Sequence, residues 1–219
     1  TIYHNSNIEQ IEESHKLSID NFTKPLDYNI QFSEGMINIA KTTNDKNLVE
    51  LNIKDYKKPN LPMKIFKRED NSTDIRIRRE QSAEPDILIP GFSKKKEVIW
   101  DLNISNKTST NINLNYAVSE ANIDLRGLRV DNLNIDSGIS STEIVFGDHP
   151  TNAKIESGIS DIDLHFPNSN PIVIETKGGL IDMNLDNFEK VGNKYYSQNF
   201  NQTNDTINIV INAGISSIE

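Results

Sequence analysis

The sequence predicts an all-β protein, built as a β-solenoid of stacked rungs about 20 residues long, similar to a single-stranded right-handed β-helix. Two observations lead to this class. Near-copies of one hexapeptide, Asp136-Ser-Gly-Ile-Ser-Ser and Glu156-Ser-Gly-Ile-Ser-Asp, lie twenty positions apart, and Asn212-Ala-Gly-Ile-Ser-Ser closes the chain. Ile, Val, Thr and Asn are abundant, Ala is scarce, and long helical periods are absent, a composition typical of strands.

The glycine of each copy anchors the repeat. The anchor positions, at which glycine provides a structural turn and Ala117 occupies the equivalent slot one period earlier, are Ala117, Gly138, Gly158, Gly179 and Gly214. Apolar residues recur before the anchors at two fixed offsets: Ile112, Leu133, Ala153, Ile174, Ile209 and Leu114, Ile135, Ile155, Ile211. They recur after the anchors as Val118, Ile139, Ile159, Leu180, Ile215, then Ile123, Ile144, Leu164, Leu185, then Leu125, Phe146, Phe166.

Each period is therefore predicted to be an alternating strand, a tight glycine turn and a second alternating strand. Alternation places all these apolar residues, Ile139 and Ile159 included, on one face, and stacking buries them in a continuous core. The glycine supplies either a positive φ or a close backbone approach. The alternative is a β-sandwich whose spacing is coincidental.

Three regions are predicted along the chain: a polar lead-in at 1–16, an N-terminal β region at 17–104, and the glycine-anchored repeat at 105–219. Within the second region, strands are expected at 26–32, 48–53 and 98–104, with a degenerate repeat around Gly35. A hairpin is expected from Met63–Phe66 to Ile75–Ile77, followed by a long loop at 80–97 rich in Pro, Gly and Lys.

One insertion, residues 186–206, interrupts the period before the last rung. It holds four aromatic residues, Phe188, Tyr195, Tyr196 and Phe200. They form either a flap that covers an edge of the solenoid or an exposed aromatic binding surface. The final rung, Ile207 to Glu219, is expected to leave a partly open edge, through which the protein could associate weakly with itself.

Composition excludes several classes of protein. The chain has no cysteine, so it has neither disulfides nor thiolate metal sites nor a cysteine nucleophile. Its net charge is −9, which argues against nucleic acid as a partner. No apolar run approaches the roughly 20 residues that span a membrane. The first residue is Thr1 rather than Met, so an N-terminal signal or anchor is expected to be missing from the chain.

Candidate chemistry is limited. No Gly-x-Ser-x-Gly, P-loop or His-Glu-x-x-His motif occurs, and no catalytic residue is proposed. Outward-facing oxygen ligands from neighbouring rungs could group into a calcium site, for which the candidates are Asp161, Asp163, His165, Glu143 and Asp182. The alternative is an ordinary solvated polar ladder. A second set could contact anionic wall polymers, again with a solvated strand face as the alternative: Arg76, Arg78, Arg79, Arg126 and Arg129.

Several segments of the chain resemble a known family. The segments that carry the resemblance are Ile30-Gln-Phe-Ser-Glu-Gly-Met-Ile-Asn-Ile39, Trp100-Asp-Leu-Asn-Ile104, Ala121-Asn-Ile-Asp-Leu-Arg-Gly-Leu128 and the glycine-anchored rungs. The first half is similar to the toast-rack domain, and the second half to the putative-adhesin, LiaF-like β-repeat of bacterial envelope proteins. The family pattern prefers Gly-Ala-Gly at the turns, where this chain has Ser-Gly-Ile.

The resemblance implies a non-catalytic envelope protein, adhesin-like or active in the response to envelope stress, whose partner is a protein or polymer of the cell surface. It also implies export or anchoring at the envelope, and no catalytic residues or cofactor. Two alternatives are a carbohydrate-active β-helix enzyme and a self-associating envelope scaffold. Polysaccharide lyases on β-helices have long loops around a groove, whereas this chain has mostly tight connections, which favours the first interpretation.

Overall fold

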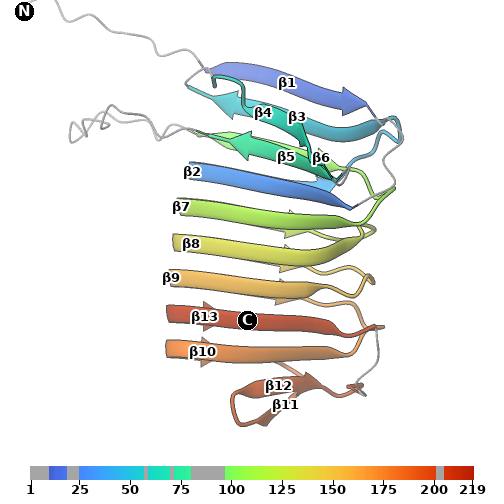
Figure 1. Ribbon diagram of the computed structural model, residues 1–219. Helices are drawn as coiled ribbons and strands as arrows, with labels where there is room; N and C mark the ends of the chain where they lie inside the picture. Colours follow the sequence, from blue (N-terminus) through green and yellow to red (C-terminus); the bar gives the residue numbers. More distant parts are fainter. Residues whose placement is uncertain (1–9, 19–24, 57–58, 70–71, 80–96, 201–204) are drawn as a thin grey trace, which may run out of the picture.

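The protein forms one continuous sheet. The computed structural model describes residues 10–18, 25–56, 59–69, 72–79, 97–200 and 205–219 (Figure 1). These residues contain no helix and thirteen strands, all connected by pairing: β1 (Ile11–Ser18), β2 (Leu26–Lys41), β3 (Asn47–Asp55), β4 (Met63–Lys67), β5 (Thr73–Arg78), β6 (Ile99–Ile104), β7 (Thr110–Asp124), β8 (Val130–Val145), β9 (Asn152–His165), β10 (Ile172–Met183), β11 (Phe188–Val191), β12 (Lys194–Ser197) and β13 (Ile207–Ile218). The all-β prediction is confirmed.

Six long strands are stacked in parallel, in the order β2-β7-β8-β9-β13-β10 (Figure 1). Each repeat lies opposite the equivalent residues of the next, so Ile135 pairs in register with Ile155, and Ile155 with Ile211. Equivalent side chains therefore form columns along the stack, spaced about 4.8 Å apart. The predicted periodicity is thus the pairing register of the sheet.

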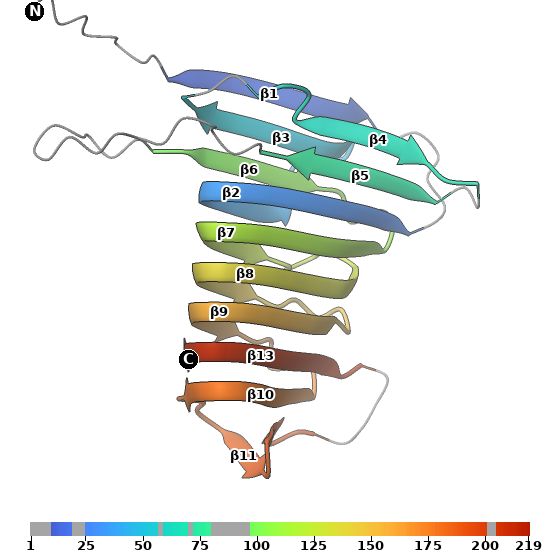
Figure 2. The same cartoon turned by 60° about the vertical axis from the view of Figure 1, so that its left-hand side comes forward.

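Each long strand bends near its middle. Ser137 and Ser140 are three residues apart, yet both are buried and their hydroxyl oxygens lie 3.2 Å apart. Residues three apart would point to opposite faces of a flat strand, so the strand must turn between them. Figure 2 shows the strands curving back behind their own first halves. The two halves form a front layer and a back layer, and the apolar core lies between the layers.

The bend corrects one prediction. Ile135, Ile155, Ile144 and Leu164 are buried as expected, but Ile139 and Ile159 project into solvent, 57% and 51% exposed. In β8 the inward positions are 133, 135 and 137 before the bend and 140, 142 and 144 after it. The alternation therefore shifts by one residue at the bend, and the residue after each glycine faces outwards.

The anchor glycines permit close approach of neighbouring backbones. A Cβ atom on Gly158 would lie 2.8 Å from the carbonyl oxygen of Gly138, and one on Gly214 would lie 2.6 Å from that of Gly158. Neither distance leaves room for a side chain without a backbone shift. Positive φ occurs at Gly178 and Gly35, but at none of the anchors Gly138, Gly158, Gly179 and Gly214.

The last strand is not at the end of the stack. β13 lies between β9 and β10 and pairs in parallel with both. The expectation of an open edge at the final rung is therefore wrong, because that rung has a neighbour on each side. The stack ends at β10, where the hairpin β11–β12 covers residues Val173–Glu175 by antiparallel pairing. The insertion is thus a flap over an edge, one of its two predicted forms.

The N-terminal region belongs to the same sheet. β2 pairs with β7 across the predicted boundary at residue 104, and β4–β5 form the expected antiparallel hairpin. β1 falls largely within the predicted lead-in but is a strand paired with β3. The predicted loop lies almost wholly outside the described residues.

A buried ion pair joins three strands of this region. The Arg79 guanidinium donates to both carboxylate oxygens of Asp55, at 2.7 and 3.1 Å, and the Trp100 indole donates to the same carboxylate at 3.2 Å. Burial alone would raise the pKa of Asp55, but the hydrogen bonds and charge of Arg79 outweigh it and the pKa is lowered. The pair fixes β3 and β6 to the end of β5.

Candidate functional site

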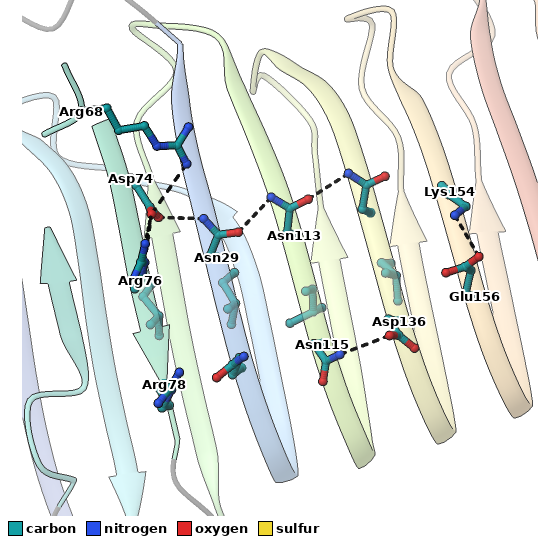
Figure 3. A pocket seen from close by; sticks show the side chains of 16 residues that line it. Asn29, Arg68, Asp74, Arg76, Arg78, Asn113, Asn115, Asp136, Lys154 and Glu156 are labelled. Carbon is teal, nitrogen blue, oxygen red and sulfur yellow. Dashed lines mark hydrogen bonds and ion pairs between the residues drawn. The ribbon is translucent and has the colours of Figure 1, made fainter. Parts of the chain in front are cut away.

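A polar groove of about 640 Å³ crosses the outer face of the front layer. Its walls come from β5, β2, β7, β8 and β9, which lie side by side at that face (Figure 3). We refer to it as the front groove. The pairing register aligns the outward side chains of these strands into columns, in which neighbouring polar groups follow one another at about 4.8 Å intervals.

The central column is a ladder of asparagine amides. Asn134 donates to the Oδ1 atom of Asn113 at 2.9 Å, and Asn113 donates to that of Asn29 at 3.1 Å. Asn29 in turn donates to Asp74 at 2.7 Å (Figure 3). Each amide is oriented by its neighbour, so the ladder presents fixed donors and acceptors along the groove.

Arginines line the β5 end of the groove. Arg76 and Arg68 lie 2.8 and 3.7 Å from the carboxylate of Asp74, which is buried. Burial would raise the pKa of Asp74, but the hydrogen bonds from Asn29 and Arg76 and the charges of Arg76 and Arg68 lower it. Arg78 is exposed, and within the described residues its guanidinium has neither an ion-pair nor a hydrogen-bond partner. Its five donors remain available.

Carboxylates and a lysine line the opposite end. Asn115 donates to Asp136 at 3.3 Å, and Lys154 lies 2.8 Å from Glu156. Asp136 and Glu156 are opposite each other on β8 and β9. A guanidinium, planar amides and carboxylates thus follow one another across the groove. These groups bind hydroxyls, amides and single negative charges, which are the groups of polysaccharides and their modified forms.

Comparison with known proteins places the chain in a family. Residues 5–165, well over half of the chain, match the family model described as the N-terminal domain of toast_rack, DUF2154. The chain belongs to the toast_rack N-terminal domain family. No curated protein matches it.

A solved structure shares the architecture of this chain. A putative cell adhesion protein from Clostridium sporogenes is similar over 96% of this chain and 98% of its own, with 21% identity and a TM-score of 0.81. That match shows the fold. A putative adhesin from Bacteroides fragilis aligns over 96% of each chain, at 12% identity and a TM-score of 0.32.

The candidate calcium residues of this toast_rack domain do not converge. Glu143 and Asp163 are neighbours on β8 and β9, and His165 lies 3.2 Å from Glu143. Asp182 is separated from Asp161 by Ser217, because β13 lies between β9 and β10. Within the described residues, no three His, Asp or Glu side chains are placed to hold a metal ion. The prediction placed Asp182 beside Asp161 because it assumed that β10 stacks directly on β9, and that part of the predicted arrangement does not occur.

The four aromatic residues do not form one surface. Tyr195 and Phe188 pack against the core, where Phe188 lies 5.7 Å from Phe166. Tyr196 instead pairs with Phe200, their ring centroids 4.7 Å apart. All four side chains are half-buried. The rings therefore hold the hairpin on the end of the stack.

The candidate arginines are also dispersed. Arg76 and Arg78 line the front groove, whereas Arg79 is buried against Asp55. Arg126 pairs with Asp124 at 2.6 Å in the connection between β7 and β8. The amide ladder itself was not among the sequence candidates. The recurrence of asparagine at the interval of the repeat, as in Asn113 and Asn134, was a signal that could have identified it.

The described residues include no helix with the length and apolarity needed to cross a membrane.

Proposed function

We propose that this protein is a non-catalytic, adhesin-like module of the bacterial cell envelope, and that its front groove binds a polysaccharide of the cell surface. One observation carries the proposal. A ladder of mutually oriented amides, from Asn134 to Asn29, runs across the groove to Asp74, and beside it Arg78, opposite Gln31 on β2, has no guanidinium partner among the described residues. Fixed donors at a regular interval suit a ligand that is itself a polymer of repeating polar units.

The family and the fold are compatible with this role. The chain belongs to the toast_rack N-terminal family, and it shares its fold with a protein described as a putative cell adhesion protein. On this proposal the module acts at the cell surface and needs no cofactor. The six bent parallel strands would be the rungs of a β-solenoid, a scaffold that offers an extended face to a long ligand.

Sedimentation with insoluble cell wall tests the proposal. We expect the protein to sediment with peptidoglycan carrying its native polymers, and Arg78→Ala to weaken binding about 10-fold or more, since a charge-assisted hydrogen bond contributes about 1.5–3 kcal/mol. Lys46→Ala is the control, because Lys46 is an exposed cation that lies outside the groove. Equal binding by Arg78→Ala and the unsubstituted protein would contradict the assignment of the groove.

The alternative of a carbohydrate-active enzyme rests on Asp136 and Glu156, which are neighbours in the same groove. Paired carboxylates are the usual catalysts of glycoside hydrolysis. Incubating the protein with wall polysaccharides and analysing the products distinguishes the two functions. The binding proposal expects no turnover. Turnover that disappears in Asp136→Asn would establish the enzyme instead.

The scaffold alternative rests on the open part of β10. Past Thr176, the outer edge of β10 has no strand partner among the described residues. An unpaired edge can add a strand from another chain. Light scattering over a wide concentration range would detect this association, and Ile181→Lys on the open edge should then abolish it.

A further inference from the structure

A ridge of apolar side chains runs along the bend of the stack. It consists of the residues that follow the anchors, in stacking order Val118, Ile139, Ile159, Ile215 and Leu180. They pair in register, one from each of the strands β7, β8, β9, β13 and β10. Each is more than half exposed, the extreme being Leu180 at 75%. We call this column the apolar ridge.

At the bend, polar side chains face the interior and apolar side chains face the solvent, the reverse of the usual arrangement. Immediately after the ridge, Ser140, Ser160 and Ser216 point inwards and are buried, and the hydroxyls of Ser160 and Ser216 lie 2.7 Å apart. Serines therefore occupy the interior of the bend while isoleucines occupy the surface. Burial in this chain's own core does not explain the isoleucines, and contiguous exposed apolar side chains are typical of interaction sites.

Carboxylates border the ridge on both sides. Two positions past the ridge residues, one column alternates exposed carboxylates with serines, in the order Glu120, Ser141, Asp161, Ser217 and Asp182. On the other side, a shallow depression of about 440 Å³ follows the anchor glycines and is lined by Asp136 and Glu156. Within the described residues, no ion pair is formed by Glu120, Asp161 or Asp182. The ridge is thus an apolar strip with carboxylates on both sides, of which Glu156 is already paired with Lys154 at 2.8 Å.

We propose that the apolar ridge and its acidic borders bind a basic, amphipathic polypeptide segment of a partner protein. The apolar side chains of the segment lie on the ridge, and its lysines or arginines reach the carboxylates on either side. Charge complementarity selects this occupant. The ridge and the column of Glu120, Asp161 and Asp182 lie outside the front groove, whereas Asp136 and Glu156 line both surfaces. The inference does not depend on binding of a polysaccharide.

Two other occupants fit less well. In a symmetric pair of copies, the acidic borders of one chain would face those of the other, because a two-fold interface apposes the same patch. A bilayer rich in anionic lipid would be repelled by the same carboxylates.

A synthetic peptide of alternating leucine and lysine is the probe, and one of alternating leucine and glutamate is its control. Binding is followed by titration calorimetry with the full chain. The test variant carries Ile139→Thr, Ile159→Thr and Ile215→Thr, which keep β-branched side chains at exposed positions. Val191→Thr is the matched control, since Val191 is 57% exposed on β11, away from the ridge.

We expect the lysine peptide to bind and the glutamate peptide not to bind. The triple variant should weaken binding about 10-fold or more, and Val191→Thr should leave it within about twofold. Asp161→Asn with Asp182→Asn should also weaken it and reduce its dependence on salt. Circular dichroism verifies that each variant is folded.

Three results would overturn the proposal. One is equal binding of the lysine peptide by the triple variant, which would show attraction by net charge alone. Another is dimerisation of the unsubstituted protein that the triple variant lacks, which would make the ridge a self-association surface. The third is ridge-dependent binding to phosphatidylglycerol vesicles without binding of the peptide, which would assign the ridge to a membrane.

Discussion

Ile139 and Ile159 are direct neighbours on adjacent parallel strands, and both project into solvent. Their partners in sequence, Ile135 and Ile155, are neighbours in the same two strands and are buried. The bend at the anchor glycine separates the two pairs by reversing which face the next residue occupies. One short repeat therefore contributes both a core column and a surface column.

The two columns should respond differently to the same substitution. Ile159→Thr should change the free energy of unfolding by no more than about 0.5 kcal/mol, because the side chain is exposed and threonine keeps β-branching. Ile155→Thr should cost about 2 kcal/mol or more, because it removes buried methylene and buries a hydroxyl. Urea denaturation of both variants is the measurement. Equal losses would mean that Ile159 is packed.

The close approach at the anchors predicts a steric penalty. Gly158→Val places its Cβ 2.8 Å from the Gly138 carbonyl oxygen if the backbone does not move, so we expect a loss of at least about 1–3 kcal/mol. Ala117→Ser is the control, since that anchor already carries a Cβ atom. The melting temperatures of the two variants decide the point, and an unchanged melting temperature for Gly158→Val would refute the close approach.

The Asp55–Arg79 pair should make the free energy of unfolding depend on pH in the acidic range. The pKa of Asp55 is lowered in the folded protein, so the unfolded chain takes up its proton first as the pH falls. The stabilisation is complete above the unfolded pKa, near 3.9, and is lost as the pH falls towards the lower folded value. Denaturant unfolding at pH 7 and at about pH 3 measures this loss.

Asp55→Asn should lower stability at pH 7 and weaken the dependence on acid. Asp45→Asn, at an exposed position, is the matched control. If Asp55→Asn retains the full acid dependence of the unsubstituted protein, another carboxylate is responsible.

The hairpin should contribute to stability through its inward ring. Tyr195 packs against the core, so Tyr195→Ser should cost about 1–3 kcal/mol. Val191→Ser in the same hairpin removes an exposed side chain and should cost less than about 0.5 kcal/mol. Thermal unfolding compares them. Similar small losses would show that the hairpin adds little to the stack.

Much of the fold could be predicted because the repeat encodes the pairing register. Spacing alone aligned Ile135 with Ile155 and Gly138 with Gly158, as the sheet does. The phase shift at the bend was not predictable in the same way. Ile139 is as apolar as Ile135, and alternation continued through the glycine assigns it to the wrong face.

The order of the strands at the end of the stack could not be predicted from the repeat either. Sequence order placed β10 on β9, whereas β13 returns to lie between them. The register of β13 fits β9 and β10 equally well, since Ile211 pairs with both Ile155 and Thr176. The only sequence feature that indicated this order was the length of the insertion at 186–206, which is long enough for the chain to cross back over β10 before β13 begins. The predicted neighbourhood of Asp161 and Asp182 depended on this order and does not occur, while the groove arises from columns that the order leaves intact.

Binding of a polysaccharide in the front groove can be observed at the side chains themselves. Nuclear magnetic resonance of the asparagine side-chain amides, during titration with soluble wall fragments, reports on each rung of the ladder. We predict concentration-dependent shifts of the Asn29, Asn113 and Asn134 amides, while Asn208, outside the groove, stays unchanged. Saturable binding with shifts confined to residues outside the groove, or unchanged ladder amides with every wall fragment tested, would contradict the account.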